Sequence, residues 1–323
     1  MLLNSSGWMP ELTNETENNT HLLTDDFFTS SSFEQIRSSS STSSSSCSTE
    51  SEMDGRRIYC SGRDLHTISS DIFAYPDITY LELSPTREAC LNFKLNELPN
   101  TIGRLTELHI LILDTNNLHK LPNELCNLRQ LLILVLSNNS LSALPDNIGN
   151  MEQLESIHLA NNRIRDLPVS LFQLKNLTFL DLTSNKLRQL SDGIGQLTQL
   201  QTLLLYDNRL HFIPESINQL KNLTTLWLGH NRLRTLPRGL TQLKQLDWKH
   251  NYLSTMLDEN PLVNPPISIC RLGFKAMDKW HEKNPSVNSL DLDGVQQKTA
   301  RQSSVGDEGT NKFSVRISTQ FYP

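Results

Sequence analysis

The segment LTELHILILDTNNLHKLPNEL, from Leu105 to Leu125, is one copy of a pattern that recurs along most of this chain. A second copy, LKNLTFLDLTSNKLRQLSDGI, runs from Leu174 to Ile194. The general form is LxxLxxLxLxxNxLxxLPxxI. The steps between the first six copies of its asparagine are 23 residues, and the last step is 20. These asparagines are Asn116, Asn139, Asn162, Asn185, Asn208, Asn231 and Asn251.

Each copy contains a short LxL strand, whose leucines point to one face while the residue between them points to the other. The chain then turns at the asparagine. A buried turn leaves backbone donors and acceptors that need partners. Because an asparagine amide supplies both donors and an acceptor, one asparagine per coil is able to satisfy these turns. A single coil cannot bury its own leucines, so the coils must stack.

A fixed period of about 20 to 29 residues with this pattern is the signature of leucine-rich repeats. The sequence therefore predicts an α/β fold, a right-handed leucine-rich-repeat solenoid curved like a horseshoe, with a parallel sheet on its concave face. One step of 30 residues, from Leu81 to Leu111, indicates an insertion between Ser84 and Lys94. About nine coils are expected, with their first strand positions at Ile58, Leu81, Leu111, Leu134, Ile157, Leu180, Leu203, Leu226 and Leu246.

Composition divides the chain into four parts. Residues 1–55 are acidic and rich in serine, so they cannot bury enough apolar surface to order and are predicted to be disordered. The solenoid is predicted over 56–262, a C-terminal cap over 263–283, and a flexible polar tail over 284–323. The cap is expected to be a helix because four apolar residues recur at spacings of three and four: Ile267, Cys270, Phe274 and Met277.

The charge balance and the cysteines exclude several functional classes. The formal net charge is −6, and the N-terminal tail accounts for all of it, so no nucleic-acid binding is expected. No apolar stretch reaches the length of a membrane span or forms a secretory signal. The five scattered cysteines are interpreted as small apolar residues in a reducing compartment, and a cytoplasmic location is predicted.

The sequence carries no sign of catalysis. No phosphate-binding loop and no GxSxG motif is present, and no cofactor is expected. Asp207, His230 and His250 share one column of the repeat, yet three ligands spread along a flat, open sheet converge poorly, so no metal site is predicted. The protein is therefore not expected to be an enzyme.

The 23-residue form LPxxIxxLxxLxxLxLxxNxL resembles the intracellular "Ras-binding" class of leucine-rich-repeat proteins, which includes the Ras suppressor protein and the LAP scaffolds. The segment NPLVNPPISIC, beginning at Asn260, is similar to the C-terminal cap of that class. The resemblance covers residues 58 to about 281. It implies an intracellular adaptor or scaffold, and for some members a small GTPase or phosphatase as partner. It implies no oligomer.

The residues outside the leucine pattern on each strand are predicted to line the concave face. Neighbouring coils lie about 4.8 Å apart there, and apolar residues in this column have no core to enter. Exposed apolar patches often mark binding sites, although aliphatic residues on a strand also improve sheet packing. The candidate partner-binding residues are Ile112, Val135, His158, Asp181, Leu204, Tyr206, Trp227 and Asp247.

A second candidate surface follows the asparagine of four consecutive coils. We call it the basic ridge. One hypothesis is that it binds an acidic or phosphorylated segment, from a partner or from the acidic N-terminal tail. The alternative is a solvated edge, because N-[KR]-L is a frequent form of this repeat. The ridge consists of Arg163, Lys186, Arg209 and Arg232, together with Arg165, Arg188, His211 and Arg234 two residues further on.

These patterns predict a protein–protein interaction module, an intracellular adaptor or scaffold that binds a protein partner on its concave face. The alternative is a regulatory subunit that controls a bound signalling enzyme, such as a small GTPase or a protein phosphatase. A membrane or cytoskeletal anchor is disfavoured because the sequence shows no lipidation motif.

Overall fold

The structure is a computed structural model. It describes residues 47–52, 55–60, 73, 75–85, 94–246, 248 and 257–284. These residues all belong to the second of the two compact units into which the chain divides, residues 46–323. Apart from residues 47–52 and Gly55, the predicted N-terminal tail lies outside the described residues, as do most of the Ser84–Lys94 insertion and the C-terminal tail beyond Asn284.

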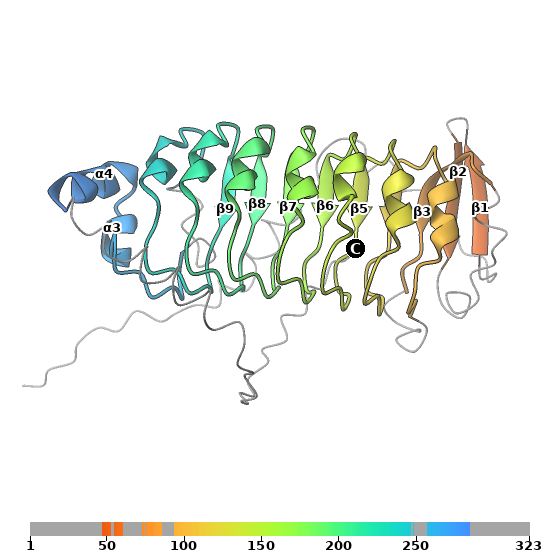
Figure 1. Cartoon of the computed structure of the whole chain (residues 1–323), viewed down its shortest axis with the longest axis horizontal. Helices are drawn as coiled ribbons and strands as arrows, with labels where there is room; N and C mark the ends of the chain where they lie inside the picture. Colours follow the sequence, from red (N-terminus) through yellow and green to blue (C-terminus); the bar gives the residue numbers. More distant parts are fainter. Residues whose placement is uncertain are drawn as a thin grey trace, which may run out of the picture. The chain divides into compact units, whose positions relative to one another are not determined.

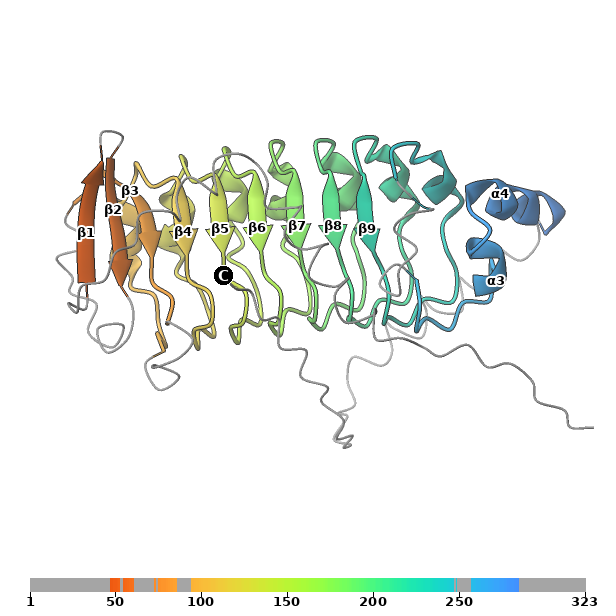
Figure 2. The same cartoon turned by 180° about the vertical axis from the view of Figure 1, so that it is seen from behind.

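The described strands form one nine-stranded sheet in sequence order (Figures 1 and 2). Strands β2 to β9 are parallel and keep the register expected from the repeat, with each strand leucine opposite the next. The strands are β1 Cys47–Glu52, β2 Gly55–Cys60, β3 Ile78–Glu82, β4 Ile110–Ile112, β5 Ile133–Val135, β6 Ser156–His158, β7 Phe179–Asp181, β8 Thr202–Leu204 and β9 Thr225–Trp227.

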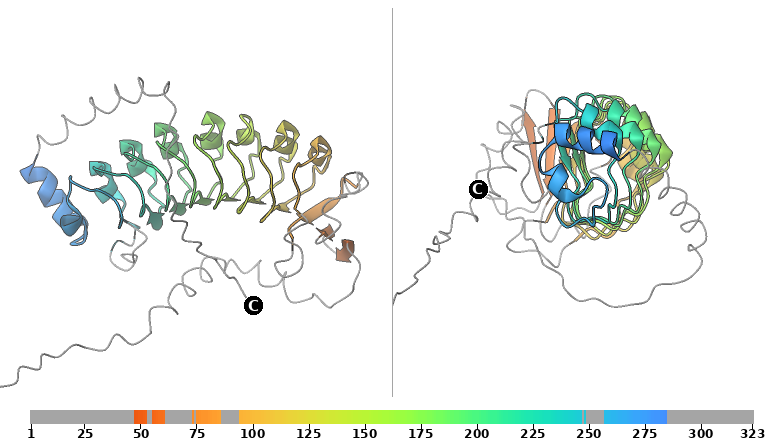
Figure 3. Two further views of the ribbon diagram at one scale, coloured as in Figure 1. Left: turned by 90° about the horizontal axis from the view of Figure 1, so that it is seen from below. Right: turned by 90° about the vertical axis from the view of Figure 1, so that its left-hand side faces the viewer.

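A row of short 3₁₀ helices lies on the side opposite to the sheet, and the row of coils curves with the strands on its inner side (Figure 3). Between the two sides lies one continuous apolar core of the repeat leucines, most of them fully buried. The predicted solenoid is therefore confirmed. The helices are η3 Asn100–Arg104, η4 Asn123–Asn127, η5 Ile148–Asn150, η6 Val169–Gln173, η7 Asp192–Gln196, η8 Glu215–Gln219 and η9 Arg238–Gln242.

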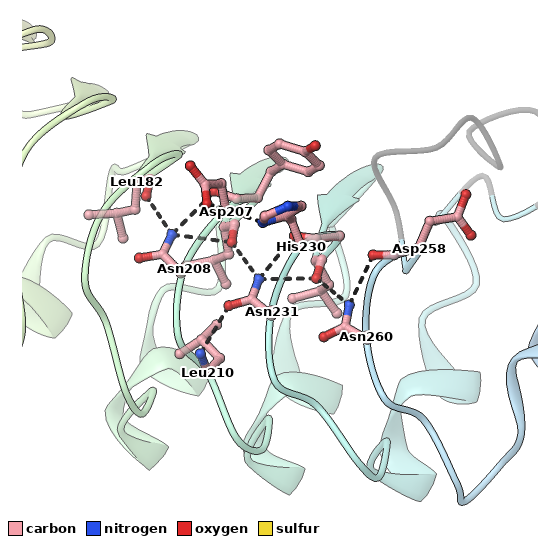
Figure 4. A network of polar contacts seen from close by, with 12 residues as sticks. Leu182, Asp207, Asn208, Leu210, His230, Asn231, Asp258 and Asn260 are labelled. Atoms are coloured by element: carbon pink, nitrogen blue, oxygen red, sulfur yellow. Dashed lines mark hydrogen bonds and ion pairs between the residues drawn. The ribbon is translucent and has the colours of Figure 1, made fainter. Parts of the chain in front are cut away.

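A ladder of buried asparagines joins the coils, as predicted. Asn231 is typical: its amide nitrogen donates to the carbonyl oxygens of Leu205 (2.9 Å) and Leu228 (3.0 Å), and its side-chain oxygen accepts from the amide of Leu210 at 3.0 Å. Each asparagine thus binds its own turn and the strand and turn of the preceding coil. Figure 4 shows three successive members of the ladder, Asn208, Asn231 and Asn260.

The seventh member of the ladder corrects the sequence prediction. Asn260, and not Asn251, donates to the carbonyl oxygen of Leu228 (2.8 Å) and accepts from the amide of Leu233 (3.0 Å). The last coil is therefore six residues longer than the period, because Asn260 lies 29 residues after Asn231. The predicted strand at Leu246 is also wrong, since this buried residue lies in a bend. Asn251 lies outside the described residues.

Backbone geometry supports this reassignment. The residue before every ladder asparagine has a positive φ, between 52° and 60°, which is rare for residues other than glycine. The residue before Asn260 has the same conformation as the other six. These residues are Thr115, Asn138, Asn161, Ser184, Asp207, His230 and Glu259.

The two ends of the solenoid also differ from the prediction. Strand β1 pairs antiparallel with β2, so the sheet begins at Cys47 rather than at residue 56. The C-terminal cap consists of two helices, α3 Ile267–Cys270 and α4 Phe274–Lys283, rather than one. Gly273 separates them with a φ of 89°, a conformation that favours glycine. The four predicted apolar residues still pack against the core.

Candidate functional site

The concave face is built from two side-chain columns of the parallel sheet. In β4 to β7 the middle residue of each three-residue strand is buried, and the residues before and after it are half-buried. Strand alternation explains this pattern, because both outer residues point away from the core. The predicted column is the one formed by the third residue of each strand. The column formed by the first residue was missed, although it follows the same 23-residue period.

The part of the face over β4 and β5 is aliphatic. Ile112 lies opposite Val135 in the parallel register, and Ile110 lies opposite Ile133. All four side chains are half-buried and none belongs to the core cluster. Two neighbouring strands thus present four apolar side chains together, of which sequence analysis had identified two.

The centre of the face, over β6 and β7, is polar. His158 lies opposite Asp181 in the register. The imidazole Nε2 of His158 is 2.9 Å from the hydroxyl of Ser156, and the ring stacks on Phe179 with centroids 4.6 Å apart. Asp181 accepts a hydrogen bond from the amide of Thr183 at 2.9 Å. Phe179 and Ser156 belong to the missed column.

Burial shifts the pKa of both central groups, His158 and Asp181. It lowers the pKa of His158 to about 4, so this imidazole is neutral at neutral pH. Burial also raises the pKa of Asp181, although its hydrogen bonds with Thr183 act in the opposite direction. Both shifts favour the uncharged form of the group.

The part of the face over β8 and β9 carries the predicted aromatic cluster. Leu204 lies opposite Trp227, and both side chains are half-buried. Tyr206, two residues after Leu204, has its ring 5.8 Å from that of His230. His230 in turn pairs with Asp207 at 3.2 Å. The structure therefore brings Leu204, Tyr206 and Trp227 to one end of the face.

Asp247, which was expected beside Trp227, lies outside the described residues. The same holds for His250, which was considered as a metal ligand. Within the described part, the His, Cys, Asp and Glu residues form no group of three able to hold a metal ion. No helix in that part is long and apolar enough to cross a membrane.

The basic ridge follows the asparagine ladder. The residue after each of the first six ladder asparagines donates its amide to a carbonyl oxygen of the preceding coil, as from Arg163 to Leu141 (2.8 Å) and from Arg209 to Leu187 (2.9 Å). These bonds align the ridge residues from coil to coil. All six arginines of the ridge are exposed, and Lys186 and His211 are half-buried.

Comparison with known proteins agrees with this geometry. The family described as "Leucine-rich repeat region" matches residues 65–162 and 133–209, and the family "Leucine Rich repeats (2 copies)" matches 198–242. The matches together run from residue 65 to 242, more than half of the chain. The chain is a leucine-rich-repeat protein. No curated protein matches its sequence.

Two solved structures are similar to this leucine-rich-repeat protein. One is a leucine-rich-repeat protein of Leptospira interrogans, with 34% identity and a TM-score of 0.56, matched over 63% of this chain and 49% of that one. The other is the plant peptide hormone receptor RGFR1 in complex with RGF2, with 25% identity and a TM-score of 0.51 over 59% and 30%. The chain spans about half the length of the first and under a third of the second. Repeats of this family form protein-interaction modules.

Proposed function

We propose that this leucine-rich-repeat protein is an intracellular adaptor or scaffold that binds a protein partner on its concave face. The partner contacts an aliphatic area on β4 and β5, a polar centre on β6 and β7, and an aromatic end on β8 and β9. The observation that carries the proposal is a set of half-buried apolar side chains on the strands that do not belong to the core cluster of the described residues: Ile110, Ile112, Ile133, Val135, Leu204 and Trp227.

Three considerations support this proposal. Apolar side chains ringed by polar groups are the usual composition of a protein-binding hot spot, and tryptophan and tyrosine are favoured there. A similar protein, the plant receptor, is named for a complex with a peptide hormone. For the location, Cys126 and Cys270 are buried, unpaired thiols, as expected in a reducing compartment.

The test compares two substitutions of the same residue type on opposite faces. Val135→Asp places a carboxylate on the concave sheet, whereas Val169→Asp does so on η6, where the side chain is 79% exposed. Partners captured from a cell lysate are quantified for each variant and for Trp227→Ala, which should weaken binding by about 2 kcal/mol if Trp227 is an anchor. Loss of a partner with the concave variants alone supports the proposal. Retention of every partner by Val135→Asp and Trp227→Ala refutes it.

The second candidate function is control of a bound enzyme, such as a small GTPase or a protein phosphatase. It uses the same face, so the distinguishing measurement is the activity of the captured partner. A scaffold leaves the turnover of its partner unchanged at saturation. A regulatory subunit changes it, and Trp227→Ala removes that change.

A further inference from the structure

The basic ridge is a second charged surface, separate from the concave face. Its eight positions occupy four successive coils in two columns. Hydrogen-bonded coils are spaced about 4.8 Å apart, so the equivalent ridge positions of neighbouring coils lie side by side. The ridge therefore presents its six arginines, Lys186 and His211 as a small two-dimensional array.

The fold itself does not require these cations. The two coils before the ridge carry Asn117 and Ser140 at the position of Arg163, and they make the same bonds to the preceding coil. The amide of Asn117 donates to the carbonyl oxygen of Leu95 at 3.0 Å, and that of Ser140 to Leu118 at 2.9 Å. The backbone geometry is thus the same with neutral side chains, so a solvated edge does not by itself explain four consecutive basic coils.

The positive charge of the ridge is not neutralised by neighbouring acids. Within the described residues, no ridge side chain has an ion pair with an acid. Asp207 pairs with His230 instead, and exposed Asp166, next to Arg165 in sequence, has no ion pair with the ridge in that part of the chain. The pKa of Lys186 is lowered by burial and by the charges of the flanking arginines. The contribution of the arginines agrees with a positive potential around Lys186.

We propose that the basic ridge binds a multiply phosphorylated segment of a partner protein. Arginine predominates over lysine, and its planar guanidinium forms paired hydrogen bonds with phosphate oxygens. Guanidinium groups on adjacent coils are close enough for two of them to hold one phosphate dianion. Four coils therefore accommodate at least two phosphates.

Two other polyanions fit the surface less well. Single-stranded nucleic acid is usually bound on stacked aromatic platforms, whereas the eight ridge positions include only His211 as a ring. Anionic membranes are favoured by apolar side chains that insert beside the cations. Of the large exposed apolar residues in the described part, Val263 adjoins the ridge, since its amide donates to the carbonyl oxygen of Arg234 at 2.9 Å. The others, Tyr75, Val169 and Leu272, have no hydrogen bond to a ridge residue there.

The test measures binding of the full chain to a fluorescent Gly/Ser peptide that carries two phosphoserines. The same peptide without phosphate, or with glutamate at both positions, is compared by fluorescence anisotropy, together with oligo-U RNA and phosphatidylserine vesicles. The phosphopeptide is expected to bind most tightly, by about tenfold or more, and binding should weaken with added salt. Equal or tighter binding of the glutamate peptide, the RNA or the vesicles overturns the proposal, as does an absence of phosphopeptide binding.

The matched variants change charge by the same amount at different places. Arg163→Glu with Arg209→Glu reverses two ridge cations, and Arg129→Glu with Lys221→Glu reverses two exposed cations that follow η4 and η8. The ridge variant should lose at least about tenfold in affinity for the phosphopeptide, and the control variant less than about twofold. Thermal melting confirms that both variants are folded. Equal losses in the two variants would show non-specific attraction and overturn the proposal.

Discussion

Removal of one ladder asparagine tests how the solenoid holds its turns. Asn185, in the middle of the ladder, is 7% exposed. Its amide nitrogen donates to the carbonyl oxygens of Leu159 (2.9 Å) and Leu182 (3.1 Å), and its oxygen accepts from the amide of Ile164 (3.0 Å). Asn185→Ala removes all of these bonds without changing the apolar core.

The expected cost follows from which groups keep a partner. Leu159 still accepts from Asn162, and Leu182 still accepts from Asn208, so each carbonyl loses one of two bonds. The amide of Ile164 loses its acceptor and is left buried, which costs about 1 to 3 kcal/mol, and each of the other bonds contributes about 0.5 to 1.5 kcal/mol. Together these losses should lower the free energy of unfolding by about 2 to 6 kcal/mol.

Urea denaturation followed by circular dichroism measures this loss. Asn176→Ala is the matched control, because Asn176 is exposed and donates one hydrogen bond, to the carbonyl oxygen of Glu152 at 3.0 Å. The control should change stability by less than about 0.5 kcal/mol. Hydrogen exchange of the Ile164 amide should accelerate only in Asn185→Ala. A loss of stability no greater than that of the control would show that the side chain of Asn185 does not stabilise the turns.

Three further predictions concern single residues. Leu226→Ala, at a fully buried strand position beside Trp227, should lower the free energy of unfolding in urea by about 2 to 5 kcal/mol, whereas an effect as small as that of Trp227→Ala would contradict its core role. The folded-state pKa of His158, about 4, lies below the ordinary 6.5, so the unfolded chain binds the proton first and the free energy of unfolding falls as pH drops from 6.5 to about 4. His158→Gln should flatten that fall by up to about 3 kcal/mol, and pH–stability curves of the same slope would argue against a half-buried imidazole that stays neutral. Burial raises the pKa of Cys126 to about 11 and that of Cys270 to about 12, so both thiols should react with Ellman's reagent only after unfolding; rapid labelling of either thiol in the native protein would show that its site opens.

The regular coils could be predicted from sequence because one physical requirement repeats in each of them. A buried turn needs a side chain with both donors and an acceptor, and a strand needs two leucines on one face. The positions of Asn185 and Leu226 therefore followed directly from the period. The column that contains Phe179 could have been predicted by the same argument, since a strand has two residues that point away from the core.

The ends could not be predicted in this way. The sequence prediction ended the last coil at Asn251, three residues short of the period. The coil is instead six residues longer than the period, and the carbonyl oxygen of Leu228 is bound by Asn260. At the other end, β1 has no apolar alternation. Its pairing with β2 depends on the free edge of that strand, which is a property of the sheet and not of the β1 sequence.

The residues that hold the fold together differ from the residues that form the two candidate binding surfaces. The asparagine ladder and the inward leucines hold each coil through groups that face the core or the backbone, so the outward side chains contribute little to the choice of fold. The concave column and the basic ridge lie on either side of that ladder, and their side chains take part in none of its hydrogen bonds within the described residues. Side chains on either surface are therefore free to differ from coil to coil, and the aromatic end at Trp227 and the four basic coils are where this chain departs from what the repeat itself requires.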